Sequence, residues 1–272
     1  MERLQAAIDK ARTQRDRGDA PQSPALEVAE PLQALETAWL ALPEIRLSRW
    51  LLHRRRIVAL QSGPTSAPYD ILRTRVAQQA QANDWHRIAV VSPHSNTGKS
   101  TTAANLAFGL ARKQGIRSIV IDADLRRSGL GTLLGQKGQT PMSDVLEGVV
   151  PFSEIARRYG SNLIFGLGFG VARNPSEILQ SARAQGVLKE IEATYAPDIM
   201  IFDMPPLSAS DDNLGFLTQV DAALIVVEAG KTSMKQIDVA ESQVSDLTNV
   251  MGIVLNKCRY MSGAYGYEEN YY

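Results

Sequence analysis

The chain has 272 residues, of which 44% are hydrophobic and 21% charged, and its formal net charge is zero. The length suits one α/β domain with an appendage, and the composition is typical of a soluble globular protein. A balanced charge excludes a general electrostatic attraction to nucleic acid or to a membrane surface, so we expect no nucleic-acid partner.

Cysteine content and hydropathy indicate the cellular compartment of the protein. Cys258 is the only cysteine, which excludes an intrachain disulfide and suits a reducing compartment. No run approaches the ~20 apolar residues that a membrane-spanning helix needs, and the first residues lack the apolar core of a signal peptide. We therefore expect a cytoplasmic protein.

Residues 1–62 differ in pattern from the rest of the chain, and we interpret them as an N-terminal arm that ends in a linker. Glu2–Arg17 and about Ala25–Leu40 have the pattern of short helices, with two prolines between them. A basic and partly apolar cluster follows, made of Arg46, Arg49, Trp50, Leu51, Leu52, Arg54, Arg55 and Arg56. This cluster could contact anionic lipid or a partner protein, but a solvated arm with little local structure is the simpler interpretation. Residues 62–66 read Ser-Gly-Pro-Thr-Ser, which is typical of a linker.

From Trp85 onward, short apolar runs alternate with longer segments of helical spacing. We predict strands at Ile88–Val91, Ser118–Ile121, Leu163–Phe165, Ile199–Phe202, Ala223–Val227 and Gly252–Leu255. We predict helices at Thr101–Lys113, Ser176–Tyr195 and Ser233–Leu247. The apolar runs show no polar alternation, as expected for strands that are buried on both faces. The pattern predicts an α/β domain over residues 63–259, with a parallel β-sheet flanked by helices and ligands bound beyond the carboxyl ends of the strands.

The segment after the first predicted strand has the features of a phosphate-binding loop. It ends in Gly98-Lys99-Ser100 and leads into a helix, which is the arrangement of a Walker A motif. Gly98 lets the backbone approach phosphate, Lys99 can reach the β- and γ-phosphate oxygens, and Ser100 can place its hydroxyl on Mg²⁺. We predict that ATP and Mg²⁺ bind here, through Ser95, Asn96, Thr97, Gly98, Lys99, Ser100 and Thr101. The position five residues before Gly98, usually glycine in this motif, is Pro93.

Three aspartates follow two other predicted strands, where they would face the same pocket. Asp122 and Asp124 come after Ser118–Ile121, and Asp203 comes after Ile199–Phe202. Carboxylates that end buried strands beside a phosphate-binding loop can hold Mg²⁺ directly or through water.

Two polar residues near the predicted pocket have less certain roles. Asn256 follows the last predicted strand, and it could either hydrogen-bond a purine edge or form a turn. His94 lies inside the loop without an evident partner, so we expect it to be solvated.

With these motifs, about residues 85–272 resemble the bacterial tyrosine autokinases of capsule and exopolysaccharide synthesis. These kinases belong to the deviant-Walker P-loop ATPases, together with the MinD- and ParA-like positioning proteins. Asp122-x-Asp124-x-Arg126 resembles the Walker A′ motif of the family, and Asp203-x-x-Pro206 resembles its Walker B motif. Asn174–Leu179, which reads Asn-Pro-Ser-Glu-Ile-Leu, resembles a further segment of these kinases.

The resemblance implies a role for each of these residues. Lys99 and Ser100 would be the ligands in the P-loop, and Lys99 would also act in catalysis. Asp124 and Asp203 would serve Mg²⁺, while Asp122 would help to deprotonate the attacking hydroxyl. The implied activity is an ATP-dependent protein-tyrosine autokinase that regulates the polymerisation and export of capsule or exopolysaccharide.

The last thirteen residues, 260–272, form a tyrosine-rich tail. Its tyrosines are Tyr260, Tyr265, Tyr267, Tyr271 and Tyr272, five of the eight in the chain. The tail could carry them incidentally, but a tail after the last strand has no core to fill. The resemblance implies that they accept phosphate in trans from a neighbouring subunit, and thus a homo-oligomer. It also implies a transmembrane polysaccharide co-polymerase supplied in trans, a cognate tyrosine phosphatase and recruitment to the inner face of the cell membrane.

Two departures from the family pattern and two alternative functions remain open. The family carries a glutamate and two arginines on the helix before the first strand, where this chain keeps only Arg73, with Arg75 nearby. The chain also contains no membrane-spanning run, so the docking element would be the arm or its arginine cluster. The alternatives are a MinD- or ParA-like ATP-switched positioning ATPase, and a catalytically weak regulatory module that binds ATP. Positioning proteins usually carry a second lysine early in the loop, where this chain has His94.

Overall fold

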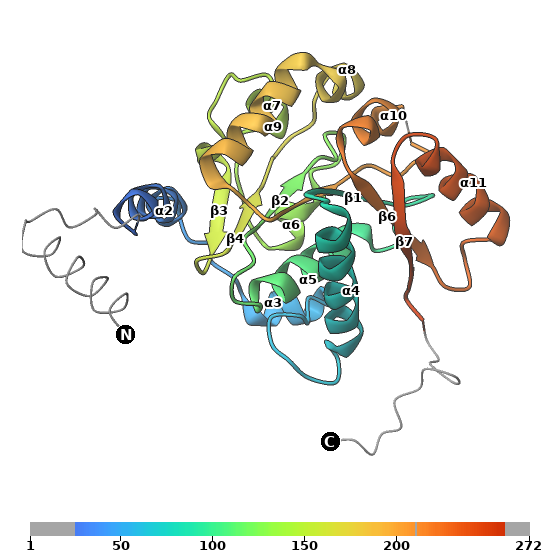
Figure 1. The fold of residues 1–272 in the computed structure, drawn as a ribbon. Coiled ribbons are helices and arrows are strands. Elements are labelled where there is room, and N and C mark those ends of the chain that lie inside the picture. Colours follow the sequence, from blue (N-terminus) through green and yellow to red (C-terminus); the bar gives the residue numbers. More distant parts are fainter. Residues whose placement is uncertain (1–24, 210, 259–272) are drawn as a thin grey trace, which may run out of the picture.

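A computed structural model describes residues 25–209 and 211–258 (Figure 1). Within these residues a seven-stranded sheet has the order β3-β4-β2-β5-β1-β6-β7, and only β3 and β4 pair in the antiparallel sense. The strands are β1 (Arg87–Val91), β2 (Ser118–Asp122), β3 (Ala156–Tyr159), β4 (Leu163–Gly166), β5 (Ile199–Asp203), β6 (Ala222–Glu228) and β7 (Asn249–Asn256). The predicted parallel sheet and its six predicted strands are confirmed.

Helices cover both faces of the sheet. They are α2 (Ala25–Leu40), α3 (Arg49–Arg54), α4 (Ala67–Asn83), α5 (Lys99–Ala111), α6 (Gly129–Leu133), α7 (Met142–Leu146), α8 (Pro175–Gln180), α9 (Ala182–Tyr195), α10 (Asp212–Phe216) and α11 (Met234–Ser245), with short 3₁₀ turns at Phe152–Glu154 and Leu217–Gln219. Along β1, Ile88 and Val90 pack into the core that α4, α5 and α6 share, whereas Ala89 and Val91 face the core under α7, α9 and α11. The alternation explains why this strand has no polar face.

The predicted helix over Ser176–Tyr195 is wrong in one respect, because the structure divides it into α8 and α9. The break falls at Ser181, whose backbone is extended (φ −69°, ψ 145°). Its hydroxyl accepts a hydrogen bond from the backbone N–H of Ala184 at 3.0 Å, which caps α9. Serine at a cap competes with helix continuation, and this local chemistry outweighs the apolar spacing that suggested one helix.

The N-terminal segment is the largest difference from the sequence interpretation. The predicted helix at Ala25–Leu40 is present as α2, but the expectation of a solvated arm is wrong for the part that follows. Trp39, Leu52 and Ile57 are buried in the two cores. Trp39 also donates its indole N–H to the carbonyl of Tyr195 at 2.8 Å. Apolar side chains spaced irregularly along a chain give no helical or strand period, which is why the sequence pattern did not reveal this packing.

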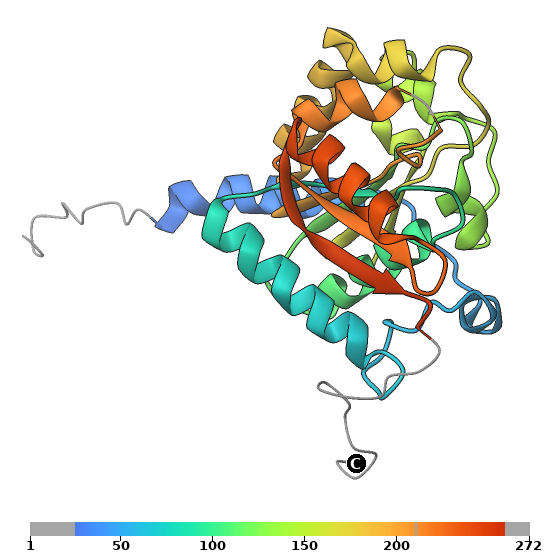
Figure 2. The same ribbon diagram turned by 90° about the vertical axis from the view of Figure 1, so that its right-hand side faces the viewer.

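The two edges of the sheet also differ from prediction. β3 was not predicted, because its sequence is Ala-Arg-Arg-Tyr and carries no apolar run. β7 was predicted to be buried on both faces, but Ile253 and Leu255 are 47% and 60% exposed. Figure 2 shows β7 at the near edge of the sheet, with α4 on one side and α11 on the other. An edge strand has a neighbour on one side only, so its outer residues are less covered.

Three expectations lie outside what the structure tests. The predicted helix at Glu2–Arg17 and the tyrosines of the tail fall outside the described residues. The division into residues 1–62, 63–259 and 260–272 stays a prediction. Among the helices of the described ranges, none has the length and hydropathy to cross a membrane.

Candidate nucleotide-binding site

The loop between β1 and α5 has the backbone shape of a phosphate-binding loop. Asn96 and Gly98 adopt left-handed conformations, with φ of +64° and +92°. Glycine enters this region without strain and asparagine is among the side chains that tolerate it best. A Cβ atom added at Gly98 would collide with Nδ2 of Asn256. Glycine is therefore required at position 98 both by its backbone angle and by its neighbour.

The end of β7 holds the loop in this shape. Nδ2 of Asn256 donates to the carbonyl of Thr97 at 2.8 Å, and Oδ1 of Asn256 accepts the backbone N–H of Lys257 at 2.8 Å. The ammonium group of Lys257 donates to the carbonyl of Asn96. The structure thus engages the Asn256 amide with the loop, and its contact with a purine stays a prediction. Lys257 was not predicted, since the residue that it contacts lies 161 positions away in the chain.

The sequence suggested that His94 is solvated, but the structure gives its ring two polar partners. Its Nε2 lies 2.8 Å from the hydroxyl of Thr232, and its Nδ1 lies 3.1 Å from the carbonyl of Ser95. Thr232 is in the loop after β6, and its hydroxyl also accepts the backbone N–H of Glu228 at 2.9 Å. The partner is distant in sequence, which explains the wrong expectation. This hydrogen bond joins the start of the phosphate-binding loop to the β6–α11 connection.

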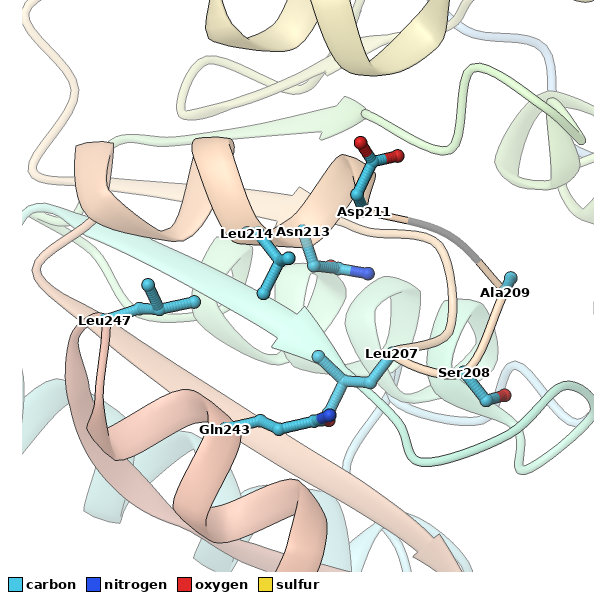
Figure 3. A pocket seen from close by; sticks show the side chains of 8 residues that line it. All are labelled: Leu207, Ser208, Ala209, Asp211, Asn213, Leu214, Gln243 and Leu247. Atoms are coloured by element: carbon cyan, nitrogen blue, oxygen red, sulfur yellow. The ribbon is translucent and has the colours of Figure 1, made fainter.

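The opening of the loop is also tied to the segment that follows β5. The backbone N–H groups of Leu207 and Ser208 donate to the carbonyls of Ser92 and Pro93, at 2.8 and 3.3 Å. The same two residues line a cavity of about 290 Å³ between α10 and α11, together with Ala209, Asp211, Asn213, Leu214, Gln243 and Leu247 (Figure 3). Asn213 is fixed there, because its Nδ2 donates to the carbonyl of Pro205 at 3.1 Å. The cavity adjoins the nucleotide site through the backbone of Leu207 and Ser208.

A buried ion pair lies at the centre of the candidate site. Nζ of Lys99 is 2.5 Å from Oδ1 of Asp203, and the two side chains are 9% and 1% exposed. Lys99 begins α5 and Asp203 ends β5. β5 is a direct neighbour of β1, and Asp203 pairs with Val90 near the carboxyl end of β1. The loop that follows β1 then brings Lys99 to Asp203. Breaking such a buried pair leaves one uncompensated charge, which costs about 3–5 kcal/mol.

Asp122 lies beside this pair. β2 and β5 are neighbours in parallel register, and Asp122 is the direct partner of Asp203. Oδ2 of Asp122 accepts the backbone N–H of Leu130 at 3.0 Å. Burial first, and then the adjacent carboxylate of Asp203, raise the pKa of Asp122 well above its ordinary value. A carboxyl group with a raised pKa is a better proton acceptor near neutral pH than an ordinary aspartate is.

Asp124 completes the acidic group from the loop after β2. Its Oδ1 accepts two backbone N–H groups, from Arg126 at 3.3 Å and from Arg127 at 3.1 Å. Burial is the main cause that raises the pKa of Asp124 above its usual value. The structure therefore brings Asp124 close to Asp122, Lys99 and Asp203, beyond the carboxyl ends of the central strands. Lys99 and Asp203 lie 104 positions apart in the chain.

The donor set fits a divalent cation that also contacts phosphate. Oδ1 of Asp122 and Oδ2 of Asp203 are buried and have no hydrogen-bond partner among the described residues. Unpaired buried carboxylate oxygens call for an explanation, and a cation or a hydroxyl donor would supply it. Within residues 25–209 and 211–258, no group of three or more His, Cys, Asp and Glu side chains is arranged to hold a metal alone. Mg²⁺ commonly binds through one or two carboxylates together with phosphate oxygens and water, so these residues suit it only with nucleotide.

The remaining predicted ligands take positions that suit phosphate. Ser100 and Thr101 are in the first turn of α5, where backbone N–H groups have no helical partner. Ser95 and Asn96 are exposed, whereas Thr97 is buried with an unpaired hydroxyl among the described residues. Arg73 of α4, which was not predicted as a ligand, pairs with Asp70 at 3.3 Å.

Comparisons with known proteins agree with this geometry. The model of the family described as ParA, NUBPL iron-transfer P-loop NTPase, matches residues 84–272. The tyrosine-protein kinase YwqD of Bacillus subtilis is 26% identical over 235 residues, which cover 84% of this chain and 98% of that protein. The tyrosine-protein kinase CpsD of Streptococcus pneumoniae is 27% identical over 201 residues, which cover 73% of this chain and 86% of that protein.

The fold is similar to that of a solved kinase domain. The kinase domain of the Escherichia coli tyrosine kinase ETK has a TM-score of 0.68 and 22% sequence identity. The match covers 85% of this chain and 98% of that domain. At this identity the likeness shows the fold, and the residues of the site carry the chemistry.

Proposed function

Because the chain belongs to the ParA family of P-loop NTPases, we propose that it is an ATP-dependent protein-tyrosine autokinase. One observation supports this most strongly. The buried Lys99–Asp203 pair lies beside Asp122, whose carboxyl group has a raised pKa. These residues lie at the carboxyl ends of the central strands, next to the phosphate-binding loop. Two relatives of which the matches cover 98% and 86% are tyrosine-protein kinases by name.

The residues of the site would divide the work as follows. ATP with Mg²⁺ supplies the phosphoryl group and offsets the charge that develops during transfer. Lys99 leaves Asp203 and binds the β- and γ-phosphate oxygens, while the loop backbone and the first turn of α5 hold the phosphates. Ser100, Asp124 and Asp203 hold the cation. Asp122 accepts the proton of the tyrosine hydroxyl as the phenol oxygen bonds to the γ-phosphorus and ADP leaves.

We further propose the acceptors and partners of this reaction. The acceptors are Tyr260, Tyr265, Tyr267, Tyr271 and Tyr272, which lie outside the described residues. They are phosphorylated in trans within a homo-oligomer, and a cognate phosphatase reverses the reaction. A transmembrane polysaccharide co-polymerase recruits the protein from the cytoplasm to the inner face of the cell membrane. The process that it regulates is the polymerisation and export of capsule or exopolysaccharide.

The direct test is the phosphorylation of purified protein with ATP and Mg²⁺. We expect an anti-phosphotyrosine signal that Lys99→Met abolishes, because the variant lacks the cation that binds the phosphates. Glu192→Gln is the control, since Glu192 pairs with Arg87 at the opposite end of the sheet. Phosphosite mapping by mass spectrometry should place the phosphate on residues 260–272, and deletion of these residues should remove the signal.

Two results would contradict the proposal. Absence of phosphotyrosine with the cytoplasmic tail of the membrane partner present would exclude the kinase. ATP hydrolysis coupled to dimerisation without phosphotyrosine would instead indicate a positioning ATPase, and ATP binding without turnover would indicate a regulatory module. A signal that survives deletion of residues 260–272 would assign the acceptors to other tyrosines.

A further inference from the structure

The segment Asn174–Leu179 has no role in the nucleotide site described above, although its sequence is distinctive. It forms the start of α8, which packs against α10. The hydroxyl of Ser176 is shared between two carboxylates, that of Asp211 at 2.6 Å and that of Asp212. Figure 3 shows Asp211 at the start of α10, beside the loop that follows β5. Ser176 thus fixes the beginning of α10.

Asp212 connects this helix pair to the loop after β2. Its carboxylate is fully buried and forms a two-point ion pair with Arg126. Nε of Arg126 is 2.7 Å from Oδ2 of Asp212, and Nη2 is 3.0 Å from Oδ1. A planar guanidinium bound at two points has a fixed orientation. The position of Arg126 is therefore set by α8 and α10.

The backbone of Arg126 in turn contacts Asp124. The N–H groups of Arg126 and Arg127 both donate to Oδ1 of Asp124, so the turn at these residues orients that carboxylate. We propose that Ser176, Asp212 and Arg126 are positioning residues that orient Asp124 toward the magnesium ion bound with nucleotide. The proposal rests on the proposed role of Asp124 in holding that ion.

A second arginine–carboxylate pair provides a matched control. Arg87 contacts Glu192 in the same two-point geometry, at 2.5 and 2.7 Å. This pair joins the start of β1 to α9, at the end of the sheet opposite the nucleotide. Loss of either pair removes an ion pair of similar form, and only the Arg126–Asp212 pair reaches a residue of the site.

The experiment measures how strongly Mg²⁺ enhances binding of a non-hydrolysable ATP analogue, as the ratio of the Kd in EDTA to the Kd in Mg²⁺. For Asp212→Asn we expect this ratio to fall about tenfold, as for other residues that orient a metal ligand, with little change of the Kd in EDTA. Arg126→Lys should lower the ratio as well, because lysine cannot make the two-point contact. Ser176→Ala should lower it less, and Ser176→Thr should restore it. Glu192→Gln should leave the ratio unchanged, whatever it does to the Tm.

The variants distinguish failure of the positioning role from failure of the role proposed for Asp124. A normal ratio in both Asp212→Asn and Arg126→Lys, with a reduced ratio in Asp124→Asn, overturns the positioning role. Because Ser176 is half-buried, Ser176→Ala provides the same test if Asp212→Asn does not fold. An unchanged ratio in Asp124→Asn itself overturns the proposed role of Asp124 in the site, and the inference with it.

Discussion

Gly98 shows how one residue links the backbone of the loop to the last strand. Its φ of +92° is one that glycine adopts without strain. Asn256 fills the space that a Cβ atom at position 98 would need. For a residue with a Cβ atom, the left-handed region costs about 1–2 kcal/mol before any collision. The carbonyl that the side chain of Asn256 binds, that of Thr97, lies directly before this glycine.

We predict that Gly98→Ala weakens ATP binding at least tenfold, measured by isothermal titration calorimetry. The double variant Gly98→Ala, Asn256→Ala removes the collision and keeps the backbone strain. It should bind more tightly than Gly98→Ala but less tightly than Asn256→Ala. Equal affinities for Gly98→Ala and the unchanged protein would contradict the role given to the loop shape.

Asp122 makes a second prediction at the scale of one residue. Because burial and Asp203 raise the pKa of Asp122 in the folded protein, the folded state holds this proton to higher pH than the unfolded chain does. The contribution of Asp122 to the free energy of unfolding is then full at low pH, and it is lost as the pH rises through the raised pKa.

Asp122→Asn should therefore make the nucleotide-free protein more stable than the wild type, by an amount that grows with rising pH. Urea unfolding in EDTA, repeated from pH 5 to pH 8, measures this difference. The same variant should lose kinase activity. A difference that shrinks as the pH rises would show that Asp122 is stabilised as a charged group.

The sequence was a reliable guide to residues that belong to local motifs. Lys99, Asp122 and Asp203 each come after a recognisable apolar run. The register of β2 and β5 aligns Asp122 with Asp203, and the loop after β1 brings Lys99 to them. Contacts such as His94–Thr232 and Lys257–Asn96 could not be predicted, because they join segments 138 and 161 residues apart through loops without a motif.

At the scale of elements, the end of β7 and the residue that follows it hold the phosphate-binding loop through two hydrogen bonds, Asn256–Thr97 and Lys257–Asn96. Lys257 is central to this contact, because its ammonium group binds the carbonyl of Asn96 and also lies 3.2 Å from Oε2 of Glu228. Lys231 pairs with the same Glu228 oxygen at 3.5 Å, and the structure shows no hydrogen bond from its described side chain to the loop. The two lysines therefore form a natural comparison.

We predict that Lys257→Met lowers the affinity for ATP and speeds amide hydrogen exchange at Asn96–Gly98, whereas Lys231→Met changes neither. The reason is that only Lys257 holds a loop carbonyl, while both variants lose one ion pair to Glu228. Hydrogen exchange with mass spectrometry of the nucleotide-free protein measures the effect. Equal exchange in the two variants would show that the charge near Glu228 matters rather than the contact with the loop.

Strands made of continuous apolar runs were predicted, and elements shaped by tertiary contacts were not. The central strands β1, β2, β5 and β6 are buried on both faces, so their composition identifies them. β3 pairs antiparallel with β4 at the sheet edge, and its two arginines conceal it. The backbone of one of them, Arg158, accepts from Ile45 and donates to Pro43, contacts that no local pattern encodes.

At the scale of the whole molecule, part of the N-terminal segment belongs to the folded domain. Trp39 is 1% exposed, and its ring meets that of Tyr195 edge-on with centroids 6.3 Å apart. Trp50 provides the contrast, because it is 68% exposed and contacts Arg54 through a cation–π interaction at 5.4 Å. The two tryptophans lie in the same segment, yet only one of them joins the core.

We predict that Trp39→Ala lowers the free energy of unfolding by about 3–5 kcal/mol, the usual cost of emptying a buried aromatic site. Trp50→Ala should change the free energy of unfolding by less than about 1 kcal/mol. Denaturant unfolding followed by circular dichroism measures both. A Trp39→Ala variant as stable as Trp50→Ala would mean that the packing of Trp39 contributes little to the stability of the domain.

The contact of the end of β7 with the phosphate-binding loop has a consequence for the geometry of phosphate transfer. Fourteen residues follow Cys258, and a fully extended chain of that length spans at most about 50 Å. Under the proposed function, each subunit would carry its acceptor tyrosines within that reach of the end of β7, which contacts the subunit's own phosphate-binding loop. For short flexible linkers in general, the effective concentration at a reachable site is in the millimolar range. Once subunits assemble, the rate of transfer should no longer depend on the bulk protein concentration, and the tether length sets which neighbouring active site each tail can enter.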